Sequence, residues 1–103
     1  MNRTIAALLS LSLFVSLTGA ASAANAINGK RLAERWCASC HVVEPGQARG
    51  NTQAPPFSEV AKKPGITAAS IALFLMVPHP KMPDMGLSRT EAGDIAAYIA
   101  SLK

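Results

Sequence analysis

Residues 37–41, with the sequence Cys-Ala-Ser-Cys-His, carry the chemistry that the rest of the chain has to position. Two thiols three positions apart, followed at once by an imidazole, form the attachment pattern of a c-type haem. On a helical turn, residues i and i+3 share one face, so both sulfurs can reach the vinyl groups of one porphyrin. The pattern therefore predicts thioether bonds from Cys37 and Cys40, with His41 as the proximal iron ligand.

A Cys-x-x-Cys pair also occurs in redox dithiols, zinc sites and structural disulfides. A zinc site would need two further ligands, yet the sequence has no third cysteine and only one other histidine, His79. A thioredoxin-like site would need alternating strands and helices around the pair, and no such pattern is visible. We therefore favour haem attachment, with a dithiol as the main alternative. Because the thioethers use both cysteines, no disulfide is expected.

The start of the chain has the features of a secretory signal peptide. Arg3 is its positive residue, residues 5–17 are apolar apart from serines, and residues 19–23 are small. The apolar run is shorter than the roughly 20 residues of a membrane-spanning helix, so an uncleaved anchor is disfavoured. We expect cleavage after Ala23, with cleavage after Ala26 as the alternative. The mature protein would then be a soluble periplasmic domain, residues 24–103, without membrane insertion.

The composition of residues 24–103 limits the classes of function. Loss of Arg3 with the leader lowers the formal net charge from +4 to +3, and no run of Lys and Arg with interleaved aromatics occurs. Nucleic acid is therefore not an expected partner. Roughly 80 residues make one domain of a size at which an apolar core alone seldom suffices. A covalently held haem adds apolar surface that helices can bury, so we expect one haem c and a fold that depends on it.

Helical periodicity without any strand pattern predicts an all-α domain. A first helix over residues 28–40, with Asn28 as N-cap, leads into the attachment turn. Residues 42–56 are rich in proline and glycine, which predicts a loop, and a short helical segment over residues 57–61 follows. A metal-bound histidine normally donates its second ring hydrogen to a fixed acceptor, and a loop carbonyl near Pro55 is the candidate.

Two further helices are indicated near the end of the chain. Thr67 is a suitable N-cap for an almost wholly apolar helix that ends before Pro78, which we expect to be buried on most sides with Met76 in the core. A capping box from Ser88 to Glu91 begins the last helix. Its apolar side chains recur at helical spacing at Ala92, Ile95, Ala96, Ile99 and Leu102.

The other axial position of the iron depends on residues 79–85. Two prolines forbid regular helix there, so we expect an extended path across the distal face of the haem. Met82, Met85 and His79 are the candidate ligands, and we favour Met82 because Pro83 follows it directly. A thioether ligand gives a low-spin, high-potential electron carrier, a second imidazole lowers the potential, and an open position admits small ligands.

Together these features resemble a small bacterial class I cytochrome c with a single haem. The resemblance extends over nearly all of residues 24–103. Its motifs, in chain order, are Gly29, residues 37–41, Met82-Pro83, and a last helix that contains Ile95 and Tyr98. The resemblance implies the cytochrome c fold, an all-α architecture of three to four helices wrapped around one covalently bound haem c.

The resemblance also implies roles for individual residues. In this family the Met before the Pro is the distal ligand, which assigns His/Met ligation to His41 and Met82. Members of the family pack a glycine of the first helix against an aromatic residue of the last, which pairs Gly29 with Tyr98. The carbonyl of a loop proline accepts the hydrogen bond of the proximal histidine, and Pro55 matches that position.

A haem closed by His41 and Met82 has no free coordination position, so we expect one-electron transfer through the ring edge, without substrate turnover. The expected partners are transient redox proteins of a respiratory chain, a donor and an acceptor. Lys81, with Lys62 and Lys63, could steer acidic partners, although ordinary solvated lysines explain them equally well. A monomer or a subunit of a redox complex is expected.

Two alternative functions follow from the same residues. One is a haem-binding subunit of a larger redox enzyme complex, which would pass electrons to a partner's active site. The other is a small-ligand sensor or peroxidase-like protein, which would require that Met82 does not bind the iron. The scarcity of distal acid-base residues beyond His79 argues against the second.

Overall fold

The computed structural model describes residues 23–48, 50, 54–77 and 81–103, and these residues contain four α-helices and no strand. The helices are α2 (Ala26–Trp36), α3 (Phe57–Lys62), α4 (Ala68–Met76) and α5 (Arg89–Ala100). The predicted all-α architecture is thereby confirmed. None of the described helices is long and apolar enough to cross a membrane. The predicted signal peptide, apart from Ala23, lies outside the described residues.

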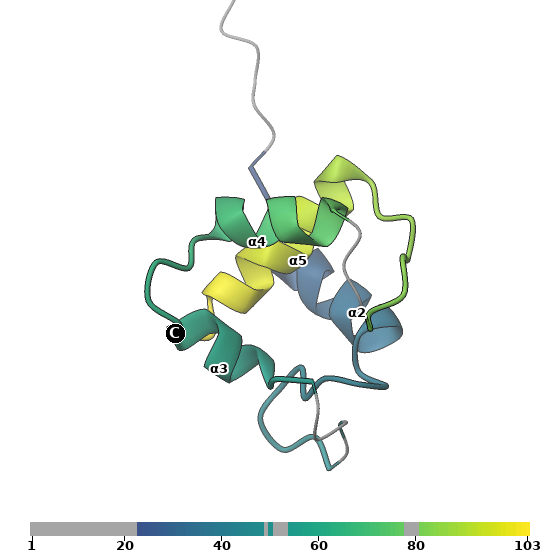
Figure 1. Ribbon diagram of the computed structural model, residues 1–103, viewed down its shortest axis with the longest axis vertical. Coiled ribbons are helices and arrows are strands. Elements are labelled where there is room, and N and C mark those ends of the chain that lie inside the picture. The colour runs from purple at the N-terminus through teal and green to yellow at the C-terminus, as the bar shows by residue number, and fades with distance from the viewer. Residues whose placement is uncertain (1–22, 49, 51–53, 78–80) are drawn as a thin grey trace, which may run out of the picture.

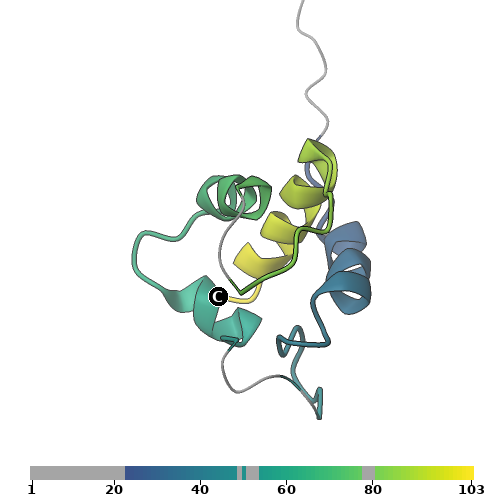
Figure 2. The ribbon, with the colours of Figure 1, turned by 45° about the vertical axis from the view of Figure 1, so that its right-hand side comes forward.

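The carboxyl-terminal helix α5 is the element on which the others pack. It contacts α2, α4 and α3. Figures 1 and 2 both show α3 and α4 on one side of the molecule and α2 on the other, with α5 between them. The predicted capping box is present, because Ser88 accepts a hydrogen bond from the amide of Glu91 and the Glu91 carboxylate accepts one from the amide of Ser88. The predicted apolar positions of α5 are buried at Ala92, Ile95, Ala96 and Ile99.

The main chains of α2 and α5 lie in close contact at Gly29. A Cβ atom at this position would overlap the carbonyl oxygen of Asp94 and lie 2.9 Å from the amide nitrogen of Ile95. The close approach expected of Gly29 is present. The atoms that require a glycine, however, belong to the main chain of α5 rather than to the ring of Tyr98. The helix backbones themselves therefore set this crossing.

A buried carboxylate fixes the start of α2. Asp94 of α5 accepts hydrogen bonds from the main-chain nitrogen of Asn25 (2.7 Å) and from the side chain of Asn28 (2.9 Å). Asn25 is also the N-cap, since its side-chain oxygen accepts a bond from the amide of Asn28 at 3.0 Å. The prediction that Asn28 caps this helix is wrong, because the side chain of Asn28 bonds to Asp94 and the side chain of Asn25 accepts the bond from the first turn.

Helix α4 begins as predicted but is less buried than predicted. Thr67 is its N-cap and forms a reciprocal capping box with Ser70. Only Ile71 of this helix is buried, whereas Leu73 and Met76 are 68% and 44% exposed. The expectation that Met76 lies in the core is therefore wrong. Among the described helices, α4 packs against α5 only. The apolar side chains on the face toward α5 are therefore covered by protein, and those on its other faces are not.

Two helical glycines give a matched test of the α2–α5 crossing. Replacing Gly29 with Ala should lower the free energy of unfolding by about 3 kcal/mol or more, because the added methyl group meets main-chain atoms that cannot move independently. Gly93→Ala, in the other helix of the pair, meets nothing within 4 Å and should leave stability unchanged or raise it by up to about 1 kcal/mol. Denaturant unfolding of both haem-loaded variants, followed by circular dichroism, measures the difference, and equal stabilities would contradict this account of the crossing.

Candidate haem site

A cavity of about 540 Å³ opens between the four helices and the segment after residue 80. Its volume lies within the range of about 300–1,000 Å³ typical of ligand and cofactor sites. The wall is mainly apolar, with Phe57, Ile71 and Ile99 among its residues. The attachment residues Cys37, Cys40 and His41 and the methionines Met82 and Met85 all line it. The structure thus brings together every described residue that the sequence predicted for the haem, and His79 lies outside the described residues.

The attachment motif forms a tight turn rather than the end of a helix. Helix α2 ends at Trp36, and the amides of Cys40 (3.2 Å) and His41 (2.8 Å) both donate to the carbonyl of Cys37. The predicted continuation of the first helix to Cys40 is therefore wrong. The turn nevertheless brings the three side chains together as the helical spacing predicted, because both cysteines and His41 line the same cavity.

The two cysteines differ in their surroundings. Cys37 is 6% exposed and belongs to the core cluster, whereas Cys40 is exposed at the rim of the cavity. Burial raises the pKa of the Cys37 thiol to about 11. A redox dithiol needs a readily formed thiolate, which this burial disfavours. The environment of Cys37 thus argues against the dithiol alternative.

The ring of His41 is held in one orientation by the loop that follows the motif. Its Nδ1 lies 2.7 Å from the carbonyl oxygen of Pro55, and because a carbonyl can only accept, Nδ1 must donate the hydrogen. This leaves the lone pair on Nε2 for a metal. The amide of Phe57 donates to the carbonyl of Val42 at 3.0 Å and joins the two segments beside this contact. The predicted hydrogen bond from His41 to Pro55 is confirmed.

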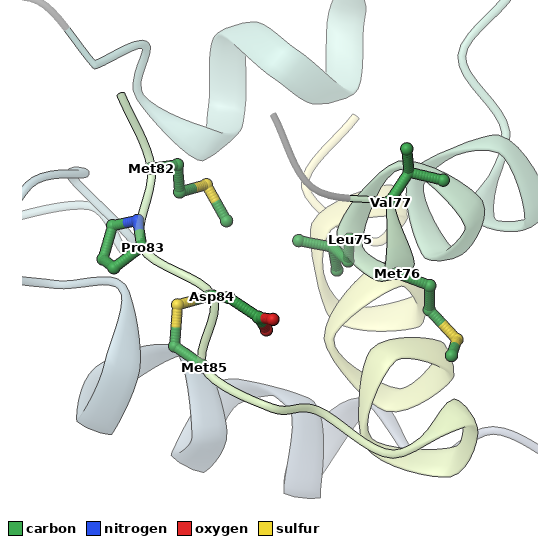
Figure 3. A pocket seen from close by; sticks show the side chains of 7 residues that line it. All are labelled: Leu75, Met76, Val77, Met82, Pro83, Asp84 and Met85. Atoms are coloured by element: carbon green, nitrogen blue, oxygen red, sulfur yellow. The ribbon is translucent and has the colours of Figure 1, made fainter. Parts of the chain in front are cut away.

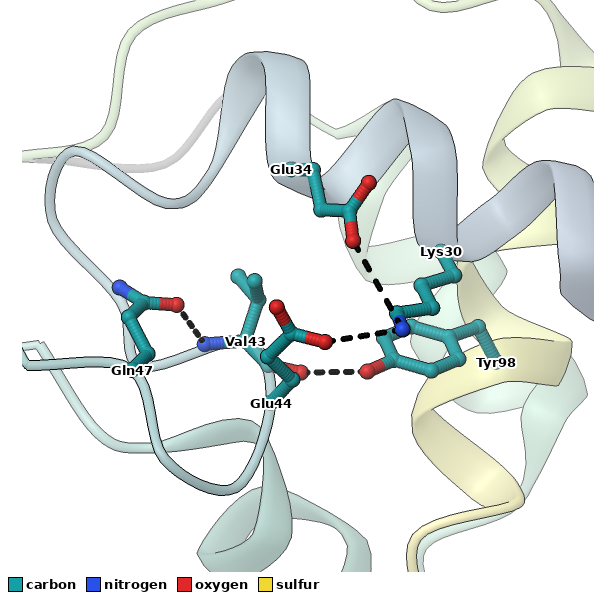
Figure 4. A network of polar contacts seen from close by, with 6 residues as sticks. All are labelled: Lys30, Glu34, Val43, Glu44, Gln47 and Tyr98. Carbon is teal, nitrogen blue, oxygen red and sulfur yellow. Dashed lines mark hydrogen bonds and ion pairs between the residues drawn. The ribbon is translucent and has the colours of Figure 1, made fainter.

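Gln47, which no sequence pattern predicted as a site residue, fixes the main chain around His41. Its side-chain amide donates to the carbonyls of His41 (2.8 Å) and Ala38 (3.1 Å), and its oxygen accepts from the amide of Val43 at 2.9 Å. Figure 4 shows the contact with Val43. A single glutamine in a loop rich in proline and glycine has no periodicity or motif that would mark it. Its three hydrogen bonds form because the folded loop places its side chain next to Ala38, His41 and Val43.

A second group of polar contacts ties the same loop to two helices (Figure 4). The hydroxyl of Tyr98, on α5, donates to the carbonyl of Val43 at 2.6 Å. Lys30, on α2, forms ion pairs with Glu44 of the loop (2.8 Å) and with Glu34 (3.8 Å). Burial raises the pKa of Tyr98. Tyr98 therefore joins the last helix to the segment that follows the proximal histidine.

The opposite wall of the cavity comes from residues 81–85. Met82 and Met85 are both half-buried, and both line the cavity that His41 lines. A smaller cavity of about 60 Å³ separates this segment from the end of α4, and Figure 3 shows the side chain of Met82 extending into the space between the segment and Leu75. A hydrogen bond of 2.8 Å from the amide of Gly86 to Asp84 closes the turn that follows.

The residues around the cavity fit a haem. Two sulfurs and an imidazole from one turn face an apolar space, with thioether side chains on the segment across it. Trp36 and Phe74 line this space and remain 42% and 56% exposed, so the protein leaves large apolar surfaces uncovered. A flat apolar ring placed in the cavity would cover such surfaces. The donor set and the wall therefore suit a covalently attached porphyrin.

Comparison with known proteins gives two matches. Residues 24–99 match the protein family described as "Cytochrome C oxidase, cbb3-type, subunit III". The chain is also 56% identical over 88 residues to cytochrome c-552 of Bradyrhizobium diazoefficiens, an alignment that covers 85% of each chain. No solved structure matches. Both matches agree with the resemblance found in the sequence motifs.

The contact between Tyr98 and Val43 gives a prediction for stability and its pH dependence. Tyr98→Phe should lower the free energy of unfolding near pH 7 by about 1–3 kcal/mol, because the buried carbonyl of Val43 loses its partner. The ordinary pKa of a tyrosine hydroxyl is 10.0, and the pKa of Tyr98 in the folded state is raised above it. Just above pH 10.0, the folded state therefore keeps the hydroxyl proton of Tyr98 while the unfolded state releases it. Stability of the parent protein should therefore fall as the pH rises above that value.

Urea unfolding at a series of pH values, followed by circular dichroism, measures both effects. In the Tyr98→Phe variant the alkaline decrease should be smaller, since the titrating group is gone. A variant with the stability and pH profile of the parent protein would contradict the structural role of the Tyr98 hydroxyl.

Proposed function

Since the chain belongs to the cytochrome c family described as "Cytochrome C oxidase, cbb3-type, subunit III", we propose that it is a periplasmic one-electron carrier with His41 and Met82 as axial ligands. Membership of this family means a covalently bound haem c and electron transfer. One observation carries the finer proposal. The His41 ring, oriented by Pro55, shares a single cavity with both cysteines and with Met82.

The proposed roles follow from the positions of the side chains. Cys37 and Cys40 form the two thioether bonds, and the Pro55 carbonyl keeps His41 in the tautomer whose Nε2 can bind iron. When bound, the haem supplies an iron centre that exchanges one electron. The mainly apolar wall and a thioether from Met82 would each favour the less charged ferrous state. Both effects raise the reduction potential.

The described lining of the cavity supports a carrier rather than an enzyme with its own substrate. Its only charged side chains are Lys63 and Lys81, and no carboxylate accompanies them. General acid-base catalysis would need a proton donor and acceptor near the reacting atom. With His41 and Met82 as ligands, both axial positions are filled. We therefore propose transient donor and acceptor proteins as the partners, and a monomer as the working form.

The family description favours a second candidate, because it names a subunit of an oxidase. In that case the chain would pass electrons within a stable complex rather than between transient partners. Size-exclusion chromatography of a native extract separates the two candidates. A free carrier elutes near the mass of one small domain, whereas a subunit elutes with its partners.

We further propose that residues 1–23 are removed on export and that the mature chain begins at Ala24. The contacts of Asn25 support this position, since its side chain caps α2 and its main-chain nitrogen donates to the buried Asp94. Cleavage after Ala26 would remove both contacts. The intact mass of the exported protein should therefore equal that of residues 24–103 plus one haem. A mass corresponding to residues 27–103 plus haem would contradict the proposal.

The ferric absorption spectrum tests the proposed ligation. In haem-loaded protein from a periplasm equipped for haem attachment, a weak band at the red end of the spectrum should report sulfur bound to ferric iron. Met82→Ala should abolish this band and lower the reduction potential, because a thioether ligand favours ferrous iron.

Met85→Ala is the matched control, since Met85 is also half-buried and lines the same cavity. This variant should keep the band. Loss of the band in Met85→Ala and its survival in Met82→Ala would assign the distal role to Met85. A high-spin ferric parent protein that readily binds cyanide would overturn the carrier proposal.

A further inference from the structure

The charges around the cavity are few and of one sign. Of its described lining residues, only Lys63 and Lys81 carry a charge, and both are cations in an otherwise neutral wall. A haem carries two propionate groups, which are anionic at neutral pH. They project from the edge of the ring opposite the edge that bears the vinyl groups. Propionates that lie along the described wall would meet only cations as charged partners.

The covalent attachment decides which end of the cavity the propionates occupy. Cys37 and Cys40 follow α2, and they bond the vinyl edge of the ring. Figures 1 and 2 both show the connection between α3 and α4 on the opposite side of the molecule from the turn after α2. Lys63 is the first residue of that connection, and Ile66, within it, also lines the cavity. A haem bonded through its vinyl edge to Cys37 and Cys40 would therefore have its propionate edge toward the part of the wall that contains Lys63.

We propose that the ammonium group of Lys63 binds a haem propionate. The proposal rests on the haem attachment proposed above and adds a binding residue outside the attachment motif. A lysine and a carboxylate form a charge-assisted hydrogen bond, which is stronger than a neutral one. In the part of the chain that the structure describes, Lys63 forms no ion pair with a carboxylate of the protein, so its charge is available for the cofactor.

Local backbone geometry distinguishes Lys63 from its neighbour Lys62. Helix α3 ends at Lys62, and Lys63 leaves the helical path with an extended backbone at φ −62° and ψ 137°. Its amide donates to the carbonyl of Val60, and its carbonyl accepts from the amide of Ile66, both at 3.2 Å. These two bonds fix the main chain of Lys63 at the cavity wall. Lys62 has the same chemistry but does not line the cavity.

A second cation strengthens the positive potential at this end. The ammonium of Lys103 donates to the carbonyl of Ile66 at 3.2 Å, so the chain terminus brings a charge to the same connection. Lys81, the other charged lining residue, directly precedes the proposed ligand Met82, and a change there would also disturb the ligand segment. Positive charge near the haem disfavours the ferric state relative to the ferrous state. Lys63 should therefore raise the reduction potential.

The experiment compares two single substitutions in the haem-loaded protein. Lys63→Gln should lower the reduction potential and shift the proton resonances of a propionate methylene group. Lys62→Gln removes the same formal charge one residue away and should change both quantities much less. Raising the salt concentration should reduce the effect of Lys63→Gln less than that of Lys62→Gln, because a direct ion pair is screened less than a remote surface charge.

Lys63→Arg provides the rescue test, since it keeps the charge and the hydrogen-bond donors. It should restore most of the potential and of the methylene shifts. Equal effects of Lys63→Gln and Lys62→Gln would overturn the inference and leave the electron-carrier proposal intact, provided that the haem spectrum is unchanged. A parent chain that attaches no haem would overturn both.

Discussion

The orientation of the His41 ring is the constraint on which the site depends. The peptide of His41 is fixed at its nitrogen by the carbonyl of Cys37 and at its carbonyl by Gln47, while the ring itself donates to Pro55. Three independent bonds therefore define where Nε2 can be. A ligand oriented in advance loses little conformational freedom when it binds a metal. The loop between the motif and α3 thus has a specific task despite its irregular backbone.

The contact between α2 and α5 determines where the attachment turn and the loop after it lie. Gly29 brings the two helix backbones into contact, and Asp94 fixes the first turn of α2 through Asn25 and Asn28. At its other end the same helix stops at Trp36, where the attachment turn begins. The position of the turn relative to α5 follows from this contact. Tyr98 and Lys30 then join the two helices to the loop beside the turn.

The features that could be predicted are those with a local cause. The capping boxes at Thr67 and Ser88 depend on residues three apart, and the attachment motif lies within five positions, so the sequence alone reveals them. The start of α2 cannot be predicted in this way, because Asn25 and Asn28 are both suitable N-caps by residue type and their contacts with Asp94 depend on a residue far along the chain. Gln47 was missed for the same reason, since its partners are defined by the folded loop.

The apolar sequence of α4 predicts more burial than the structure shows, because apolar content alone does not tell whether protein or cofactor covers a side chain. The large buried apolar side chains of the described chain are few, chiefly Phe57, Ile71, Ile95, Tyr98 and Ile99, so the protein's own core is small. Phe74 and Trp36 remain half exposed along the cavity. A porphyrin in that space would supply the missing apolar contacts. Under the proposed function, the apolar wall that would raise the reduction potential would also complete the core with the haem, so substitutions in it should alter potential and stability together.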